Sequence, residues 1–168
     1  SRVSRGLGDV YKRQGDYSVP ITISFWFKFN GTSEPKGGYV FTNNEGGSTS
    51  EEYIIHRYDN TNQLRFRRAD NNNSDFYIDT PDLGDDTWAF ITIVISADDN
   101  AKLYTNGVLS GTNTNDRWGV SLTNTDFKFG GPHLETGDGS TIYVPCSMES
   151  FHISYQALTE SEIITRYN

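Results

Sequence analysis

The sequence predicts an all-β fold, an antiparallel β-sandwich of the jelly-roll type with a short C-terminal helix. Aromatic residues that favour strands are abundant, with 10 Phe, 10 Tyr and 3 Trp among 168 residues. About ten segments with strand-like patterns follow one another at intervals of roughly 8–12 residues, separated by turns rich in Gly, Asn and Ser. Only the end of the chain carries the signals of a helix.

The first clear strand is residues 21–29, ITISFWFKF. Five apolar residues alternate along it with four others, which is the period of a strand with one buried face. Shorter segments of the same kind predict strands over residues 39–42, 53–58, 63–68 and 74–79. The polar residues 59–62 predict a hairpin turn between the second and third of these shorter strands.

The densest strand signal lies at residues 87–111. Residues 87–96, TWAFITIVIS, are apolar on both faces and predict a central strand. Asn106-Gly107 lies between two apolar segments and predicts a tight hairpin, because both residues of such a turn take positive φ. We therefore expect a three-stranded meander here.

The rest of the chain predicts the last strands and a helix. Strands are expected over residues 127–131, 140–144 and 147–155. In the last of these, strict alternation would place on one face Met148, Ser150, His152 and Ser154. Thr159 is followed three residues later by Glu162, which forms a capping box and predicts a helix over residues 160–167.

Residues 1–14, SRVSRGLGDVYKRQ, differ from the rest in composition. They hold four basic residues and one acidic residue, whereas residues 15–168 hold 10 basic and 21 acidic residues. The stretch resembles the translation of a sequencing-adapter read-through, as occurs at the ends of open reading frames assembled from environmental DNA. We therefore expect residues 1–14 to be non-native and residues 15–168 to form one domain. The alternative is a natural basic arm.

Charge, apolar runs and cysteine content argue against nucleic acid as a partner, membrane insertion and an internal disulfide. The formal net charge of −8 disfavours nucleic acid, because phosphate binding needs a basic surface. No apolar run approaches the ~20 residues of a membrane-spanning helix, so we expect no membrane insertion. The single cysteine, Cys146, cannot form a disulfide within the chain, and we expect it to be a small buried residue.

Three segments together resemble the laminin-G-like, concanavalin A-like lectin/glucanase jelly-roll domains. They are ITISFWFKF, TWAFITIVISADDNAKLYTNGVLSG and CSMESFHISYQALTESEIITRY, in that family's order and spacing. The resemblance covers residues 15–168 and implies two stacked sheets, one concave and one convex. It also implies an extracellular or cell-surface location in a larger protein, calcium in many members, and glycans or other protein domains as partners. The family's opening strand would be shortened to residues 15–20 or replaced by the segment 1–14.

The resemblance implies a calcium site, with Ca²⁺ as the only cofactor expected. Glu149 stands where the family's closing strand commonly carries an acidic residue, and Asp16 would face it across the sheet edge. Calcium needs about 6–8 oxygen ligands from carboxylates, carbonyls and water, so other groups would have to complete the site. The alternative is that Glu149 and Asp16 are two solvated surface acids.

A polar loop at residues 113–119 contains the most prominent candidate for a glycan contact, Trp118. Its neighbours in the loop are Asn115, Asp116 and Arg117. Sugars stack on aromatic faces and form hydrogen bonds with such polar side chains, so this set predicts a ligand site. The alternative is that Trp118 anchors the loop over the core. Trp26 and Trp88 lie inside predicted strands and are expected to be packing residues.

A second candidate set for glycan binding is Tyr58, Arg65 and Arg67. Alternation places both arginines on the face opposite Leu64 and Phe66. Two aligned guanidinium groups suit a carboxylated or sulfated polysaccharide. The alternative is pairing across strands with the acidic residues Glu51, Glu52 or Asp75.

The sequence gives little support for catalysis. The resembling glucanases carry Glu-x-Asp-x-x-Glu on one strand, and this string does not occur. A polysaccharide lyase would use a Tyr or His base beside an Arg, and one hairpin offers His56, Arg57, Tyr58, Arg65 and Arg67. We expect a non-catalytic recognition module, most simply for carbohydrate. The alternatives are a structural or adhesion domain that binds proteins, and a polysaccharide lyase or glycoside hydrolase of the same fold.

Overall fold

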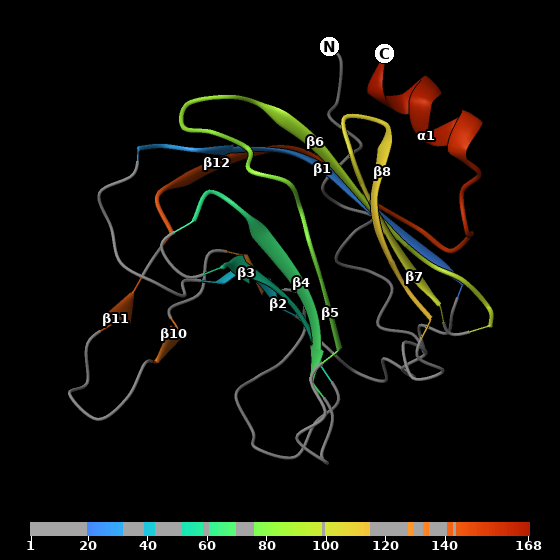
Figure 1. Cartoon of the computed structure of the whole chain (residues 1–168), viewed down its shortest axis with the longest axis horizontal. Coiled ribbons are helices and arrows are strands. Elements are labelled where there is room, and N and C mark those ends of the chain that lie inside the picture. The colour runs from blue at the N-terminus through green and yellow to red at the C-terminus, as the bar shows by residue number, and fades with distance from the viewer. Residues whose placement is uncertain are drawn as a thin grey trace, which may run out of the picture.

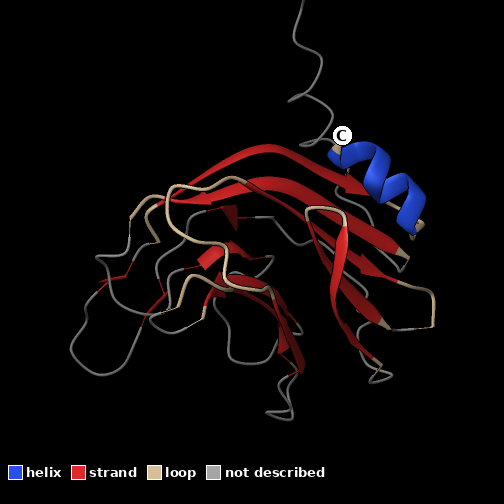
Figure 2. Ribbon diagram, turned by 45° about the horizontal axis from the view of Figure 1, so that its top comes forward, coloured by secondary structure: helices blue, strands red, loops and turns tan. Residues whose placement is uncertain are grey.

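The computed structural model of the chain describes residues 20–31, 39–42, 52–58, 61–69, 76–98, 100–114, 128–129, 133–134, 141–142 and 144–168. These residues form two stacked antiparallel sheets of five strands each, a two-stranded pair and a C-terminal helix (Figures 1 and 2). The predicted all-β sandwich with a short C-terminal helix is confirmed.

The two large sheets are built from different parts of the chain. The first sheet has the order β12-β1-β6-β7-β8, and its strands are β1 (Ile21–Phe29), β6 (Ala89–Ile95), β7 (Ala101–Thr105), β8 (Val108–Asn113) and β12 (Cys146–Ser154). The second sheet has the order β5-β4-β3-β2-β9, and its strands are β2 (Tyr39–Thr42), β3 (Glu52–Arg57), β4 (Leu64–Ala69), β5 (Phe76–Asp79) and β9 (Lys128–Phe129). The remaining elements are β10 (His133–Leu134), β11 (Thr141–Ile142) and the helix α1 (Glu160–Tyr167).

The core lies between the two sheets and is rich in phenylalanine. Phe25, Phe27 and Phe29 of β1 are fully buried, as the alternation of this strand predicts. The rings of Phe27 and Phe29 meet edge to face, with their centroids 4.8 Å apart. Phe41 of β2 and Phe66 of β4 join the same cluster from the second sheet.

The outer face of the first sheet is also covered, because the C-terminal segment folds over it (Figure 1). Ile163 of α1 is buried against Val94 and Tyr104 of the sheet. The Thr22 hydroxyl donates a hydrogen bond to the Gln156 carbonyl at 2.6 Å. This covering explains why Thr22 and Ser24, on the outer face of β1, are buried as well.

The predicted meander and hairpin are present. Strand β6 is buried along its whole length and lies third of five in the first sheet, which makes it the central strand expected. Asn106 and Gly107 join β7 to β8 and have φ angles of 53° and 76°, the positive values that such a turn requires. The Asn106 side chain also accepts a hydrogen bond from the Phe90 backbone N–H at 2.8 Å.

Strand β12 does not alternate strictly, so that prediction is wrong. Ser150 has a φ of +52°, and the pairing of β1 with β12 shifts register at this point. Met148 packs on the core before the irregularity, and Phe151 and Ile153 pack on it afterwards. A β-bulge adds one residue to a strand, so each later side chain points to the opposite face from the one that strict alternation predicts.

Trp26 packs inside the fold as predicted, whereas the prediction that Trp88 does so is wrong. Trp26 packs as expected, with its ring centroid 5.3 Å from that of Phe90 and 5.8 Å from that of Tyr167. Trp88 instead precedes β6 and is 36% exposed, with the Lys28 ammonium 5.5 Å from its ring centroid. The strand begins after Trp88, and α1 covers the sheet at Trp26 but leaves Trp88 in contact with solvent.

Two smaller expectations also need correction. Cys146 is half-buried at the start of β12 rather than fully buried, and partial burial raises the pKa of its thiol. The short strand β10, paired with β11, was not expected from the sequence. It has only two residues, too few for a period of two to be detected.

The predicted capping box fixes the start of α1. The Glu162 carboxylate accepts from the Thr159 backbone N–H at 2.8 Å, and the Thr159 hydroxyl accepts from the Glu162 backbone N–H at 3.4 Å. The hydrogen bond from the Thr159 N–H and a further one from the Thr159 hydroxyl at 2.7 Å lower the pKa of the Glu162 carboxyl, since both favour its charged form. The cap positions the helix that covers the first sheet.

Removing this cap is expected to loosen the helix. Thr159→Ala should lower the free energy of unfolding by about 1 kcal/mol, the usual cost of losing a threonine cap. Urea unfolding followed by circular dichroism measures the change. Thr165→Ala, in the middle of the same helix, is the matched control. An equal loss in both variants would mean that the cap has no special role.

Gly111 lies where the edges of the two sheets meet. A Cβ atom at this position would lie 2.7 Å from the Ile78 methyl group, closer than such atoms approach in folded proteins. We expect Gly111→Ala to cost about 1–3 kcal/mol, because Ile78 is buried and must shift. Ser110→Ala, on the exposed side of β8, should cost much less in the same urea titration. Equal stability of the two variants would contradict this packing.

Among the described residues, no helix combines the length and the apolar character that crossing a membrane requires.

Candidate functional site

The outer face of the second sheet carries a stack of two tyrosines and an arginine. Leu64 and Phe66 of β4 point into the core, so the residues between and after them point outward. The guanidinium carbon of Arg65 lies 3.7 Å from the ring centroid of Tyr58 and 3.9 Å from that of Tyr77. We call these three residues, together with Asp79, the tyrosine–arginine ladder.

An ion pair fixes the arginine of the ladder. Asp79 of β5 lies directly opposite Arg65 in the antiparallel register. The Arg65 Nε and Nη2 groups donate to the two Asp79 carboxylate oxygens at 2.7 and 2.8 Å. The hydrogen bond to Asp79 raises the pKa of Arg65, although partial burial acts in the opposite direction. The pair is bidentate, which gives the guanidinium one fixed plane between the two rings.

The two tyrosines are held differently. Tyr58 belongs to the turn between β3 and β4, where its N–H donates to the Gln63 carbonyl at 3.0 Å and its carbonyl accepts from the Thr61 N–H at 3.1 Å. Tyr77 lies on the edge strand β5 and is 48% exposed. The ladder therefore presents one tyrosine to solvent and braces it from behind with a cation–π contact.

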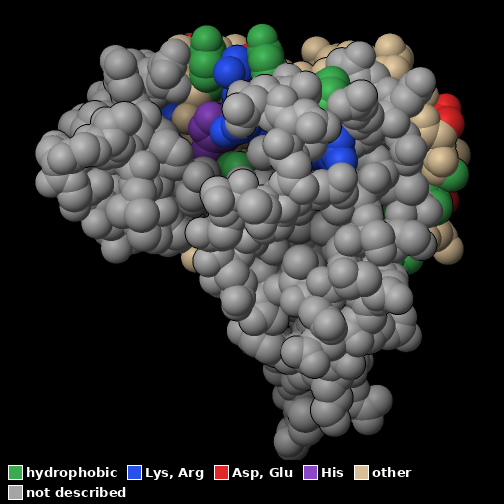
Figure 3. All heavy atoms as spheres, turned by 90° about the horizontal axis from the view of Figure 1, so that it is seen from below, with side chains coloured by type: hydrophobic (Ala, Val, Ile, Leu, Met, Phe, Trp, Pro, Cys, Tyr) green, Lys and Arg blue, Asp and Glu red, His purple; other side chains and the backbone are tan. Residues whose placement is uncertain are grey.

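Further basic residues flank the ladder. Arg67 lies opposite Tyr77 in the pairing of β4 with β5, and His56 lies opposite Arg65 in the pairing of β3 with β4. Figure 3 shows Lys or Arg side chains beside a histidine and hydrophobic side chains on one face of the molecule. In the strand pairing, Arg65, Arg67, His56 and the acid Asp79 are neighbours among the described residues of the second sheet, whereas the whole chain has a net charge of −8.

The residues suggested for a lyase do not all share this face. Arg57 is 2% exposed and points to the other side of the sheet, where its guanidinium carbon lies 5.0 Å from the Phe29 ring centroid. Its Nε donates to the Thr61 carbonyl at 2.7 Å, and its Nη2 donates to the Asn62 side chain at 2.9 Å. Arg57 thus stabilises the turn after β3.

The other predicted site residues are placed as follows. Asn115, Asp116, Arg117, Trp118 and Asp16 lie outside the described residues. Glu149 is exposed on β12, next to the bulge at Ser150. In the described part of the chain, no group of three or more His, Cys, Asp or Glu side chains is arranged to hold a metal ion.

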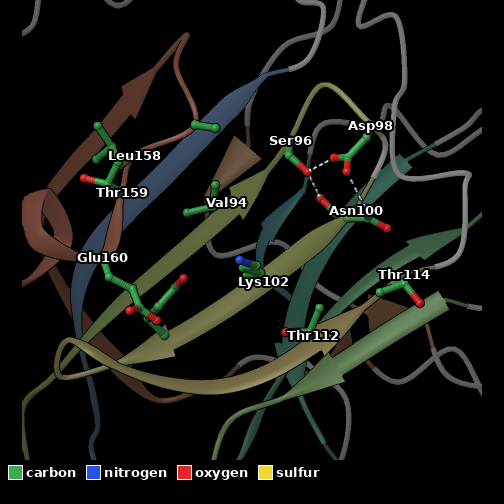
Figure 4. Close-up of a pocket in the computed structure, with 12 residues that line it drawn as sticks. Val94, Ser96, Asp98, Asn100, Lys102, Thr112, Thr114, Leu158, Thr159 and Glu160 are labelled. Carbon is green, nitrogen blue, oxygen red and sulfur yellow. Dashed lines mark hydrogen bonds between the residues drawn. The ribbon is translucent and has the colours of Figure 1, made fainter.

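A hollow of about 560 Å³ lies on the opposite side of the sandwich, on the outer face of the first sheet (Figure 4). Its floor is apolar and is formed by Val94, Tyr104 and Leu158, which pack together. Its polar lining is Ser96, Asp98, Asn100, Lys102, Thr112, Thr114, Thr159 and Glu160. The hollow therefore joins the loop after β6 to the start of α1.

The sequence predicts part of the ladder but not the hollow. Tyr58 and Arg65 belong to the second predicted set for glycan binding, whereas Tyr77 and Asp79 do not. The available signal was the alternation of β5, which places these two residues on one face of the strand. No local pattern predicts the hollow, because its walls come from segments about 60 residues apart in the chain.

The chain belongs to the concanavalin A-like lectin/glucanases superfamily. The family model of laminin G type with this description matches residues 10–164, which confirms the resemblance seen in the sequence. The match begins inside the segment 1–14, so the expectation that this segment is non-native stays a prediction. No curated protein matches the chain in sequence.

Three solved structures that share this fold are named as binding domains or as a CBM40. The botulinum neurotoxin serotype D binding domain has a TM-score of 0.68 and 22% identity, over 90% of this chain and 37% of that one. The binding domain of Paraclostridial Mosquitocidal Protein 1 has a TM-score of 0.64 and 22% identity, over 91% and 38%. The CBM40 of the Ruminococcus gnavus IT-sialidase, bound to alpha2,3 sialyllactose, has a TM-score of 0.63 and 16% identity, over 92% and 85%. The chain spans little more than a third of the toxin domains.

Proposed function

We propose that this chain is a non-catalytic carbohydrate-binding module that holds an acidic polysaccharide on the outer face of its second sheet. The observation that supports the proposal most strongly is the tyrosine–arginine ladder. In it, the half-exposed Tyr77 ring stacks on Arg65, and Asp79 fixes the Arg65 guanidinium. The module would act at the cell surface or outside the cell, as part of a larger protein.

The ladder has the properties that sugar stacking needs. An aromatic ring offers a flat apolar surface to the C–H groups of a sugar, and its hydroxyl group offers a hydrogen bond. A ring that is already held in place loses little conformational entropy on binding. Arg65 lies 3.9 Å from the Tyr77 ring centroid and is itself fixed by two hydrogen bonds to Asp79. Tyr77 is therefore preorganised for a ligand.

The charge of the face favours an acidic ligand over a neutral one. Arg65, Arg67 and His56 gather on an otherwise acidic chain. Arg65 is paired with Asp79, and Arg67 lies opposite Tyr77 in the strand pairing. A carboxylated or sulfated sugar unit stacked on Tyr77 would lie beside both guanidinium groups. The CBM40 of the same fold is bound to a sialylated sugar, which is consistent with this choice.

The same residues argue for binding rather than catalysis. A lyase needs a free base beside an arginine that neutralises the substrate. Here Arg57 faces the core side of its sheet, and Arg65 is occupied by Asp79. The proposal therefore assigns no catalytic residue to the ladder.

A glycan array tests the proposal. The chain is applied to sulfated, carboxylated and neutral polysaccharides, once with Ca²⁺ and once with a chelator. We expect binding to the acidic polysaccharides, weakened by salt because charges contribute to it. Absence of binding to every acidic glycan would overturn the proposal and favour a domain that binds proteins.

The two conditions of the array also test the calcium site and the loop around Trp118. Binding that disappears with chelator would make Ca²⁺, with Glu149 and Asp16 as candidate ligands, part of the site. If binding persists with chelator, the glycan is bound either by the ladder or by the loop around Trp118. Trp118→Ala distinguishes these two sites, since its affinity should be unchanged if the ladder alone binds the glycan.

A further inference from the structure

The hollow on the first sheet is a candidate for a second binding site. It lies on the side of the sandwich opposite the tyrosine–arginine ladder, and none of the residues that line it belongs to the ladder. Its volume of about 560 Å³ falls within the ~300–1,000 Å³ that is typical of small-molecule sites. It is therefore large enough for one or two sugar rings.

One wall of the hollow is a preorganised set of hydrogen-bonding groups. The Asp98 carboxylate accepts from the Ser96 hydroxyl and, at 2.8 Å, from the Asn100 side-chain amide (Figure 4). These two hydrogen bonds lower the pKa of Asp98, so the carboxylate stays ionised. Each carboxylate oxygen can accept a second hydrogen bond, which leaves room for ligand hydroxyl groups.

The floor and the opposite wall complete the arrangement. Val94, Tyr104 and Leu158 are at most 8% exposed and form an apolar base. Burial raises the pKa of Tyr104, and the nearby charge of Glu160 adds to the effect, so the phenol stays protonated. Glu160 itself lies at the far end of the hollow, beside the start of α1, and provides a second carboxylate.

The charges of the hollow select the kind of ligand. Its described lining holds two carboxylates, Asp98 and Glu160, and one ammonium group, Lys102. An anionic ligand would meet net repulsion, whereas hydroxyl groups find acceptors in both carboxylates and a donor in Lys102. An apolar floor below polar walls matches a sugar ring, which has a C–H face and a rim of hydroxyl groups.

From these observations we infer that the hollow between residues 94–98, residues 100–104, Thr112, Thr114 and residues 157–160 is a second carbohydrate site, specific for an uncharged sugar unit. Asp98 and Glu160 accept its hydroxyl hydrogens, and Val94 and Leu158 contact its apolar face. The module would then hold two different sugars on opposite faces.

Nuclear magnetic resonance titration of the ¹⁵N-labelled full chain tests this inference. The probes are D-glucose, D-galactose, D-mannose and N-acetylglucosamine, each added separately. We expect at least one sugar to cause saturable shifts of backbone amides in residues 96–104 and 157–160. Absence of shifts there with all four sugars, or shifts confined to other residues, overturns the inference.

Two variants of the hollow should weaken this binding. Asp98→Asn removes a charged acceptor, and a hydrogen bond to a charged group is worth about tenfold in affinity or more. Thr112→Trp fills the hollow from the exposed strand β8 and retains the Asp98 carboxylate with its hydrogen-bonding partners, so it remains informative if Asp98→Asn disturbs folding. Both variants should lower affinity about tenfold, and unchanged affinity in Thr112→Trp contradicts the inference.

Two controls separate this site from other effects. Asp82→Asn alters another loop carboxylate, which accepts from the Gly84 N–H at 2.8 Å far from the hollow, and should leave affinity unchanged. Tyr77→Ala should also leave it unchanged, because Tyr77 belongs to the ladder. A loss of neutral-sugar binding in either control overturns the inference. The acidic-glycan array succeeds or fails independently of all these results.

Discussion

Replacing Tyr77 by alanine is expected to lower the affinity for an acidic polysaccharide by about tenfold or more while leaving the fold intact. An exposed, preorganised aromatic ring at the centre of a binding face is the kind of residue that contributes most to affinity. Tyr77 is 48% exposed on an edge strand, so its loss removes little from the core. Isothermal titration calorimetry with the polysaccharide selected on the array measures the change.

Tyr155→Ala is the matched control for Tyr77→Ala. Tyr155 is also an exposed tyrosine, at 42%, and it follows β12 in the first sheet rather than lying on the ladder. Its replacement should leave the affinity unchanged. Equal effects of the two substitutions, or none in Tyr77→Ala, would remove the ladder from the binding site.

Replacing Phe27 by alanine is expected to have the largest effect on stability, lowering the free energy of unfolding by about 3–5 kcal/mol. Phe27 is fully buried in the second half of β1, which pairs with both β6 and β12. Its ring makes edge-to-face contacts with Phe25 at 6.4 Å and with Phe29 at 4.8 Å. Two strands pair with β1, so the surrounding structure has little freedom to close the cavity.

Urea unfolding monitored by fluorescence measures this loss. Val108→Ala, at a residue that is 70% exposed, should change the free energy of unfolding by less than about 0.5 kcal/mol. A cost for Phe27→Ala that is no larger than this control would mean that the core between the two sheets is not packed as described.

The sequence predicts those features of the fold that depend on neighbouring residues. Apolar and other residues alternate along residues 21–29, which predicts the buried face of β1. Asn106-Gly107 predicts the turn because both residues readily take the positive φ that it requires. Thr159 and Glu162 form a capping box from side chains three residues apart. Each of these signals lies within a few residues, and each was confirmed.

Features that depend on how distant segments pair could not be predicted. The bulge at Ser150 follows from the pairing of β12 with β1, more than 100 residues away in sequence. Trp88 is exposed because α1 covers the sheet elsewhere. Arg65 pairs with Asp79 because the register of β4 with β5 places them opposite each other. The alternation of β5 indicates its faces but does not indicate this register.

The decisive measurement is where an acidic sugar binds on this chain. Alpha2,3-sialyllactose and an oligogalacturonate are titrated separately into the ¹⁵N-labelled chain, and backbone amides and the Arg65 Nε–H group are followed. If the tyrosine–arginine ladder binds the sugar, at least one of the two sugars causes saturable shifts centred on Tyr58, Arg65 and Tyr77. Shifts confined to the first sheet or to other residues, or no shifts with either sugar, would contradict it.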